Sequence, residues 1–237
     1  MSDGHVVTSA FVRDQFKATF LRCAVLLYNV LVEHGNIPDA GDALDKRPTR
    51  PGDGVKARKI LWSAFRETDA DFDSVLSVLE RWIESEILEV FEDGVQLIDG
   101  TECCKSPGGA TRDRETGVYR FSSSCTLDDP RPCTIEKFWS GRERHLVTLS
   151  GLQLEKLPEH VADAVTAATE VVRDKKPPRG FRCYYALSDA VILSEAPSDL
   201  TLATTNVKDF VALSPCVERK ASVENPLVAA PPPEAPG

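Results

Sequence analysis

The stretch that decides the fold is SDAVILSEAPSDLTLATTNVKDF, residues 188–210. Asp189 heads an apolar segment that predicts a helix, and after a short polar turn residues 200–204 predict a strand. Two polar residues, Asn206 and Asp209, lie just beyond that strand. Open α/β sheets carry their functional groups at the carboxyl ends of the strands. The stretch therefore predicts an α/β domain with a polar site that contains these three polar side chains.

The composition is that of a globular protein with room for one large domain or two small ones. The chain has 237 residues, of which 42 % are hydrophobic and 27 % are charged, and its formal net charge is −9. Such a charge opposes a surface that binds nucleic acid throughout, because phosphate neutralisation dominates that affinity. It does not exclude a nuclease, whose metal-binding carboxylates are themselves acidic, and it suits a protein-binding surface.

The sequence predicts a cytoplasmic protein that does not enter a membrane. No apolar run approaches the roughly 18 residues of a membrane span. The first residues, MSDGH, lack the basic start and apolar run of a signal peptide. Seven cysteines, an odd number at irregular spacings, do not form the framework of a disulfide-rich secreted protein.

Residues 1–100 predict a domain in which three helices precede two strands joined by a tight turn. This order resembles a winged-helix domain, a fold that often binds DNA through its third helix. The predicted elements are helices over 8–34, 55–66 and 72–83, strands over 87–91 and 95–98, and a loop over 35–54.

The charge of this first segment argues against DNA and favours a protein partner. Residues 1–100 hold 11 Lys and Arg against 18 Asp and Glu, a net charge of −7. The third predicted helix carries mostly acidic residues, which would repel phosphate. We therefore expect protein docking by this domain ahead of DNA binding.

The remainder of the chain predicts a linker, a second domain and a tail. Residues 101–117 read as a linker or loop, 118–216 as the second domain, and the proline-rich residues 217–237 as a disordered tail or a clamp that orders on a protein partner. Within the second domain, strands are predicted over 118–121, 145–149 and 200–204, and helices over 134–140, 151–157 and 159–173.

Three segments of the second domain together resemble PIN domains. The unit from Leu146 to Glu155 resembles their second strand and the glutamate that follows it. Residues 188–192 resemble their third acidic position, and residues 204–210 are similar to their last strand and its polar end. The resemblance covers about residues 118–213.

This resemblance implies a Rossmann-like parallel sheet whose acidic side chains bind Mg²⁺ or Mn²⁺ and activate water to cleave RNA. Hard divalent cations prefer carboxylate oxygens, and paired metals stabilise both the attacking and the leaving oxygen of a phosphodiester. The resemblance assigns catalysis to Glu155, Asp189 and Asp209, and metal binding to the same residues together with Asn206.

One acidic position of the PIN pattern has no clear counterpart. The first strand of the family ends in an aspartate, whereas the matching strand here is followed by Ser122. Asp128 and Asp129 come several residues late, and Asp99 would require a long insertion. A hydroxyl group cannot replace the charge of a carboxylate at a divalent metal, so a missing aspartate would leave a degenerate scaffold.

Three functions remain open from the sequence. The first is a metal-dependent ribonuclease of the toxin or defence type. The second is a non-catalytic PIN-like scaffold that serves as an interaction subunit of a larger complex, and the third is a DNA-binding regulator. Each residue also has a purely structural interpretation, because Glu155 can be solvated, Asp189 can cap its helix, and Asn206 and Asp209 can form a turn.

Overall fold

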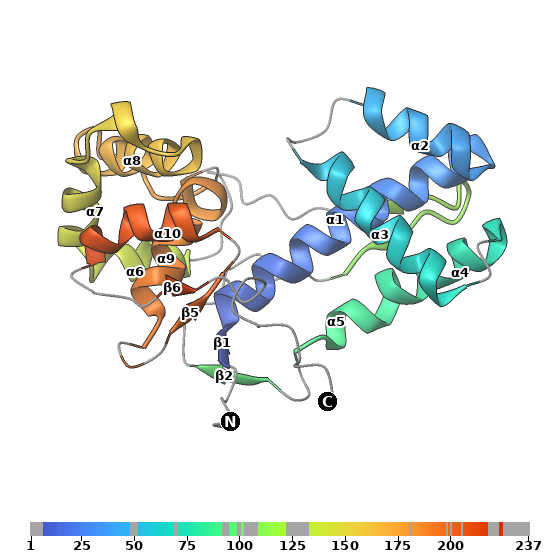
Figure 1. Cartoon of the computed structure of the whole chain (residues 1–237), viewed down its shortest axis with the longest axis horizontal. Helices are drawn as coiled ribbons and strands as arrows, with labels where there is room; N and C mark the ends of the chain where they lie inside the picture. The colour runs from blue at the N-terminus through green and yellow to red at the C-terminus, as the bar shows by residue number, and fades with distance from the viewer. Residues whose placement is uncertain are drawn as a thin grey trace, which may run out of the picture. The chain divides into compact units, whose positions relative to one another are not determined.

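The computed structural model shows a mainly helical protein (Figure 1). Its contacts divide the chain into two compact units, which we describe separately. The first unit comprises Met1–Thr8, Arg13–Leu97 and Lys105–Ser124, and the second comprises Ser9–Val12, Ile98–Cys104 and Cys125–Gly237. The structure describes residues 7–47, 52–68, 71–91, 95–98, 101, 109–121, 133–180, 182–197, 199, 201–204, 206–217 and 223–224.

In the residues that the structure describes, the first unit consists of helices, including most of α1, together with short strands. Its helical elements are α1 (Ala10–His34), α2 (Ile37–Lys46), α3 (Asp53–Glu67), α4 (Phe72–Arg81), the π-helical turn η1 (Trp82–Glu86) and α5 (Ile87–Glu89). Strand β1 (Val7–Ser9) pairs with β2 (Gln96–Ile98), and β3 (Thr111–Arg112) pairs antiparallel with β4 (Tyr119–Arg120).

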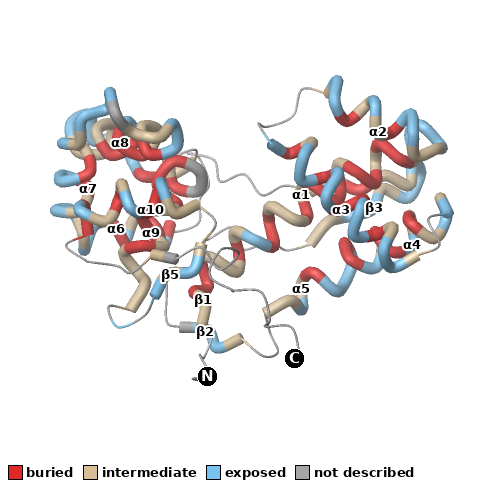
Figure 2. The backbone as a smooth tube through the Cα atoms, viewed as in Figure 1, coloured by how far each residue is buried: buried red, intermediate tan, exposed pale blue. Residues whose placement is uncertain are grey.

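The core of the first unit lies along α1, and Figure 2 shows buried residues recurring along α1 and α3. Leu27 and Leu31 of α1 are fully buried, and Val25 and Tyr28 on other sides of the helix are buried too, so α1 is enclosed by the core over more than one face. Leu79 and Ile83 continue the same cluster from α4 and η1. The predicted helices over 8–34, 55–66 and 72–83 are thus confirmed, apart from small shifts of their ends.

The loop predicted over 35–54 is wrong in part, because it contains α2. Asn36 caps this helix, since its side-chain oxygen accepts a 2.9 Å hydrogen bond from the backbone N–H of Asp39. Pro38 lies in the first turn of α2, where proline lacks only an N–H that has no helical partner anyway. Ala40 and Leu44 of α2 are buried in the core.

The strand predicted over 87–91 is also wrong, because α4 continues through η1 into α5. Ile87 follows Ile83 by four residues, and both are buried on the same face of the continuous helical segment. The predicted hairpin between 87–91 and 95–98 is therefore not formed, and β2 pairs with β1 instead. The two-stranded hairpin that would form the wing of a winged-helix domain is therefore not formed by these residues.

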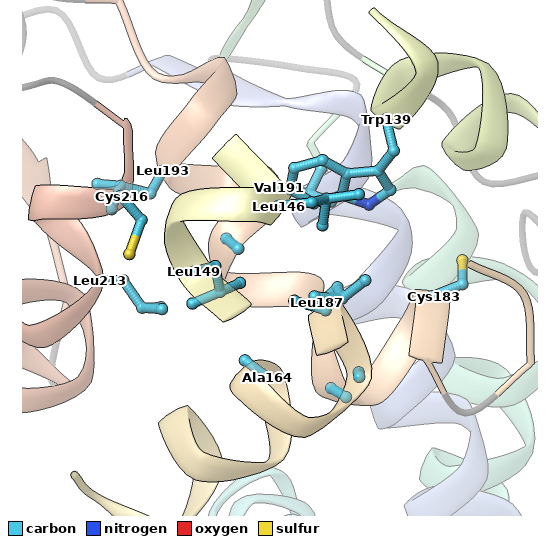
Figure 3. Packing of buried hydrophobic residues seen from close by; sticks show 14 of the residues in the cluster. Trp139, Leu146, Leu149, Ala164, Cys183, Leu187, Val191, Leu193, Leu213 and Cys216 are labelled. Atoms are coloured by element: carbon cyan, nitrogen blue, oxygen red, sulfur yellow. The ribbon is translucent and has the colours of Figure 1, made fainter. Parts of the chain in front are cut away.

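The second unit is built mostly of short helices. Its elements are α6 (Thr134–Ser140), α7 (Glu143–Ser150), the 3₁₀ turn η2 (Leu154–Lys156), α8 (Glu159–Val172), the π-helical turn η3 (Arg182–Ala186), α9 (Ser188–Glu195), β5 (Leu202–Ala203), α10 (Val207–Leu213), the 3₁₀ turn η4 (Ser214–Val217) and β6 (Val223–Glu224). Figure 3 shows the shared core, to which α7 contributes Leu149, α9 contributes Val191 and Leu193, and α10 contributes Leu213.

The structure confirms three predicted helices, over 134–140, over 159–173 and from Asp189 onward. It also confirms short strands within 118–121 and 200–204. The strand predicted over 145–149 is wrong, because α7 occupies these residues. Leu146 and Leu149 are buried three residues apart, whereas Val147 is 50 % exposed, and this spacing is helical. Residues 151–157 form only the short turn η2 in place of a helix.

The PIN-like parallel sheet is not seen in the described ranges. A short parallel pair joins β5 to β6, with Leu202 opposite Val223 and Ala203 opposite Glu224. The architecture is helical with a few short strands, so the α/β prediction holds only in this coarse form. Of the predicted tail, residues 218–222 and 225–237 lie outside the described residues.

Helix α1 is long and apolar enough to cross a membrane by length and composition alone. Core helices of soluble proteins meet the same criteria, and 56 % of the apolar window of α1 is buried inside the protein. The prediction that the protein does not enter a membrane stays a prediction.

Candidate functional site

The structure brings together Asp189, Asn206 and Asp209, which we call the Asp–Asn–Asp cluster. Asp189 lies in the first turn of α9, Asn206 precedes α10, and Asp209 lies in the first turn of α10. The side-chain Nδ2 of Asn206 donates a 2.7 Å hydrogen bond to Oδ2 of Asp209. The same nitrogen lies 3.5 Å from Oδ2 of Asp189, which makes a second, longer hydrogen bond. One amide group therefore bridges two carboxylates.

Local backbone structure positions these side chains. The N–H of Asn206 donates a 3.0 Å hydrogen bond to the hydroxyl oxygen of Thr204, which fixes the turn after β5. The carbonyl of Asn206 then accepts hydrogen bonds from the N–H groups of Asp209 and Phe210, at 3.2 and 3.4 Å, as α10 begins. Phe210 is buried and holds this first turn against the core.

Asp209 is the most deeply buried member of the cluster. Its exposed fraction is 0 %, and, within the part of the chain that the structure describes, its Oδ1 has no hydrogen-bond partner. A buried carboxylate oxygen without a partner is unfavourable by about 1–3 kcal/mol or more. A buried polar atom without a partner needs a physical explanation, and for a carboxylate oxygen a bound cation is one such explanation.

The neighbouring carboxylate of Asp209 disfavours the ionised form of Asp189. Burial raises the pKa of Asp189 above its ordinary value, and the negative charge of Asp209 raises this pKa further. His160 of α8 acts in the opposite direction through its charge, as does a hydrogen bond from Ser188. The pair therefore gains from any positive charge placed between its oxygens, whether a proton or a metal ion.

Glu155, the fourth predicted site residue, does not join the cluster. It lies on η2 and is exposed to solvent. Glu155 was expected at the site because it would follow a strand over 145–149. Those residues form α7 instead, so Glu155 does not follow a strand. No group of three or more His, Cys, Asp or Glu side chains arranged to hold a metal is found in the described ranges.

The other candidates for an acidic position cannot be placed. Ser122, Asp128, Asp129 and Asp99 all lie outside the described residues. The sequence-based prediction missed His160, whose charge influences Asp189. Its position at the start of an amphipathic helix gave no signal that it would approach the cluster.

The donor set of the cluster fits a hard divalent cation. Two carboxylates and an amide oxygen are the ligand types that Mg²⁺ and Mn²⁺ prefer. Asn206 now turns its nitrogen toward both carboxylates, so it would have to rotate its amide to offer oxygen to a cation. Asp189 and Asp209 would supply the charge, and Mg²⁺ commonly keeps several water ligands when only one or two carboxylates bind it.

A second exposed feature lies on the outer side of α3. Val55, Lys59, Trp62 and Arg66 follow one another at intervals of four, three and four residues, which places them on one side of the helix. We call this set the Trp62 face. Trp62 is 69 % exposed and Val55 is 62 % exposed, and large apolar side chains at such exposure mark interaction sites when they adjoin one another.

The cations of the Trp62 face are available to a partner. In the described part of the chain, neither Lys59 nor Arg66 has a carboxylate within ion-pair distance, whereas the neighbouring Arg58 pairs with Asp45. The face thus combines an aromatic side chain with two exposed, positively charged side chains, in a segment whose overall charge is negative.

Comparison of the chain with protein-family models, with curated proteins and with solved structures found no match.

Proposed function

We propose that the second unit is a metal-dependent endoribonuclease that binds Mg²⁺ or Mn²⁺ at the Asp–Asn–Asp cluster and hydrolyses RNA phosphodiesters. The observation that supports this proposal is the bridge from Asn206 to both carboxylates beside the unpaired, buried Oδ1 of Asp209. In this proposal, the resemblance to PIN domains that matters for function is the one over residues 188–210, which hold the Asp–Asn–Asp cluster.

Each residue of the cluster has a distinct role in this proposal. Asp189 and Asp209 hold the cation through their carboxylate oxygens, and Asn206 sets the orientation of Asp209 through its 2.7 Å hydrogen bond. His160 of α8 lies near enough to Asp189 for its charge to lower the pKa of that carboxyl. A bound divalent cation supplies a water of lowered pKa and neutralises charge on the phosphate.

Cleavage of a labelled single-stranded RNA by the purified full chain tests this function. We expect cleavage with Mn²⁺ or Mg²⁺ that stops with a chelator and falls by about 100-fold or more in Asp189→Asn, since the variant loses a charged metal ligand. Glu155→Gln is the matched control, because an exposed side chain outside the cluster should leave the rate unchanged. Asp209→Asn keeps the shape of the buried side chain and provides a second variant.

Calorimetric titration of the full chain with MnCl₂ separates binding from chemistry. We expect one cation per chain with the parent protein and markedly weaker binding with Asp189→Asn. Absence of both cleavage and cation binding would refute the proposed function, whereas binding without cleavage would leave a metal-binding scaffold and refute the nuclease.

A second candidate function, an interaction subunit, is favoured by the Trp62 face. The occupant that fits is an acidic protein segment with one apolar residue, which would pack against Trp62 while its carboxylates pair with Lys59 and Arg66. Tryptophan and arginine are enriched at the energetic centres of protein interfaces. Single-stranded nucleic acid is the weaker fit, because two free cations neutralise few phosphates and residues 1–100 carry a net charge of −7.

Tryptophan fluorescence offers a direct test of this second candidate. Trp62 is exposed whereas Trp82 and Trp139 are buried, so a quencher in solution reports mainly on Trp62. An Asp- and Glu-rich peptide with a single leucine should protect Trp62 from quenching, and the double variant Lys59→Glu, Arg66→Glu should abolish the protection. Protection by a single-stranded oligonucleotide but not by the peptide would overturn the protein partner.

A further inference from the structure

Two tyrosines and two glutamates of the first unit form a cluster at the side chain of Arg112. Tyr28 of α1 and Tyr119 of β4 are each 2 % exposed, and their rings meet edge to face with centroids 4.9 Å apart. Glu80 lies in α4, and Glu84 lies in η1. We call Tyr28, Tyr119, Glu80 and Glu84 the tyrosine cage.

Each carboxylate of the tyrosine cage is held by a buried phenol. The hydroxyl of Tyr28 donates a 2.5 Å hydrogen bond to Oε1 of Glu80, and the hydroxyl of Tyr119 donates one to Oε1 of Glu84. Glu84 belongs to a π-helical turn, a feature that occurs frequently at functional sites. The carboxylates themselves are partly or fully exposed. Two buried rings therefore orient two acidic groups that solvent and a partner can reach.

The cage already holds one guanidinium group. Nη2 of Arg112 donates a 2.8 Å hydrogen bond to the hydroxyl oxygen of Tyr28 and lies 2.8 Å from Oε1 of Glu80. Cζ of Arg112 lies 5.7 Å from the ring centroid of Tyr28 and 5.6 Å from that of Tyr119. Both distances are within the range of a cation–π interaction. The cage thus combines charge, hydrogen bonding and ring faces, the set of contacts that a planar guanidinium group makes.

The cation in the cage can be exchanged. Arg112 belongs to the hairpin of β3 and β4, and its side chain is 44 % exposed. Ion pairs at such exposure contribute little to stability, so little is lost when another cation replaces this one. The hairpin turn has its own hydrogen bonds, from the N–H of Asp113 to the carbonyl of Val118 and from the N–H of Gly117 to the carbonyl of Asp113. The side chain of Arg112 can therefore leave the cage while β3 and β4 stay paired.

We propose that the tyrosine cage binds an arginine side chain of a basic protein segment, and that Arg112 fills the cage when this partner is absent. The charge around the cage supports such a partner, because residues 71–89 hold six Asp or Glu against one basic residue, Arg81. The site uses no residue of the Asp–Asn–Asp cluster or of the Trp62 face, so it does not depend on either proposed function.

Titration of the full chain with the blocked peptide acetyl-Gly-Arg-Gly-amide, followed by ligand-detected NMR, tests the proposal. Arg112→Ala empties the cage and should bind the peptide at least about tenfold more tightly than the parent, whose cage is mostly occupied. The lysine counterpart of the peptide should bind more weakly, because an ammonium group lacks the planar fork of donors. Arg114→Ala is the matched control, since Arg114 is exposed in the same hairpin outside the cage, and it should bind as the parent does.

The double variant Arg112→Ala, Glu80→Gln separates recognition by the cage from general attraction between charges. We expect it to lose the tighter binding, because Glu80 is the carboxylate that pairs with the guanidinium group. Equal binding by the single and the double variant would overturn the proposal. So would the absence of any gain in Arg112→Ala when its circular dichroism matches that of the parent. Arg112→Gln serves as a second variant if the alanine variant does not fold.

Discussion

The guanidinium group of Arg22 forms two hydrogen bonds with the carboxylate of Asp53, each 3.0 Å long. Asp53 is buried and lies in the first turn of α3, so this ion pair joins α1 to the start of α3. The negative charge also suits the amino-terminal end of a helix. The thiol of Cys23 lies 3.7 Å from Oδ1 of the same carboxylate.

Loss of the positive partner should be costly here. We expect Arg22→Met to lower the free energy of unfolding by about 3–5 kcal/mol, because it leaves the buried carboxylate of Asp53 without a counter-charge. Methionine retains much of the apolar stem, so the effect reports on charge and not on packing. Urea denaturation followed by circular dichroism measures the change.

The control for this variant is Arg47→Met. Arg47 pairs with Glu33 at an exposed position, and such pairs contribute about 0–1 kcal/mol. Equal losses in the two variants would contradict the buried role of the Arg22 ion pair.

Asn29 substitutes for a strand partner of β4. Its Nδ2 donates a 2.8 Å hydrogen bond to the carbonyl of Tyr119, and its Oδ1 accepts a 2.8 Å hydrogen bond from the N–H of Tyr119. Asn29→Ala leaves both backbone groups of this buried residue unpaired. We expect a loss of about 1–3 kcal/mol in the free energy of unfolding, measured by urea denaturation.

Ser63→Ala is the companion measurement for Asn29→Ala. The Ser63 hydroxyl is exposed and donates a hydrogen bond to the carbonyl of Lys59 within its own helix, so its removal should change stability by less than about 0.5 kcal/mol. A similarly small effect of Asn29→Ala would mean that water replaces the lost amide.

The sequence predicted the elements that rest on local signals. The helix from Asp189 and the strand that follows it lie within about twenty residues of Asn206 and Asp209, so their proximity needed no knowledge of distant packing. The position of Glu155 did require such knowledge, because it depended on strand order in a sheet. This explains why three predicted site residues meet and the fourth does not.

The errors in secondary structure share one cause. Short apolar runs such as residues 145–149 and 87–91 fit either a strand or a helix, and only the burial pattern decides. In a strand, Val147 and Leu149 would share one face, whereas in α7 Leu149 shares its face with Leu146. The same reasoning applies to Ile87, which follows Ile83 by one helical turn.

A pair of substitutions in α7 checks this assignment. Leu149→Ala should lower the free energy of unfolding by about 2–5 kcal/mol, because it removes a fully packed side chain from the core. Val147→Ala should have an effect within about 0.5 kcal/mol, because Val147 faces solvent. Large losses in both variants would indicate the strand instead of the helix.

The pH dependence of stability should reveal the strain in the Asp–Asn–Asp cluster. The folded pKa of Asp189 is raised, so the folded protein holds a proton at pH values where the unfolded chain has released it. The free energy of unfolding contributed by this group therefore falls as pH rises from about 4, the unfolded value, through the raised folded value. The contribution of this group to stability is therefore lowest above the raised folded pKa.

Asp189→Asn should remove this penalty. We expect the variant to be more stable than the parent at pH 7, and the difference to shrink as the pH is lowered toward the unfolded pKa of about 4, because the parent carboxyl regains its proton on the way. Thermal denaturation at several pH values measures the gap, and Glu155→Gln, at an exposed position, should follow the parent at every pH. A variant less stable than the parent at pH 7 would show that Asp189 serves the fold. A more stable variant would show that the charge of Asp189 lowers the stability of the fold. Charged groups at functional sites often have this effect.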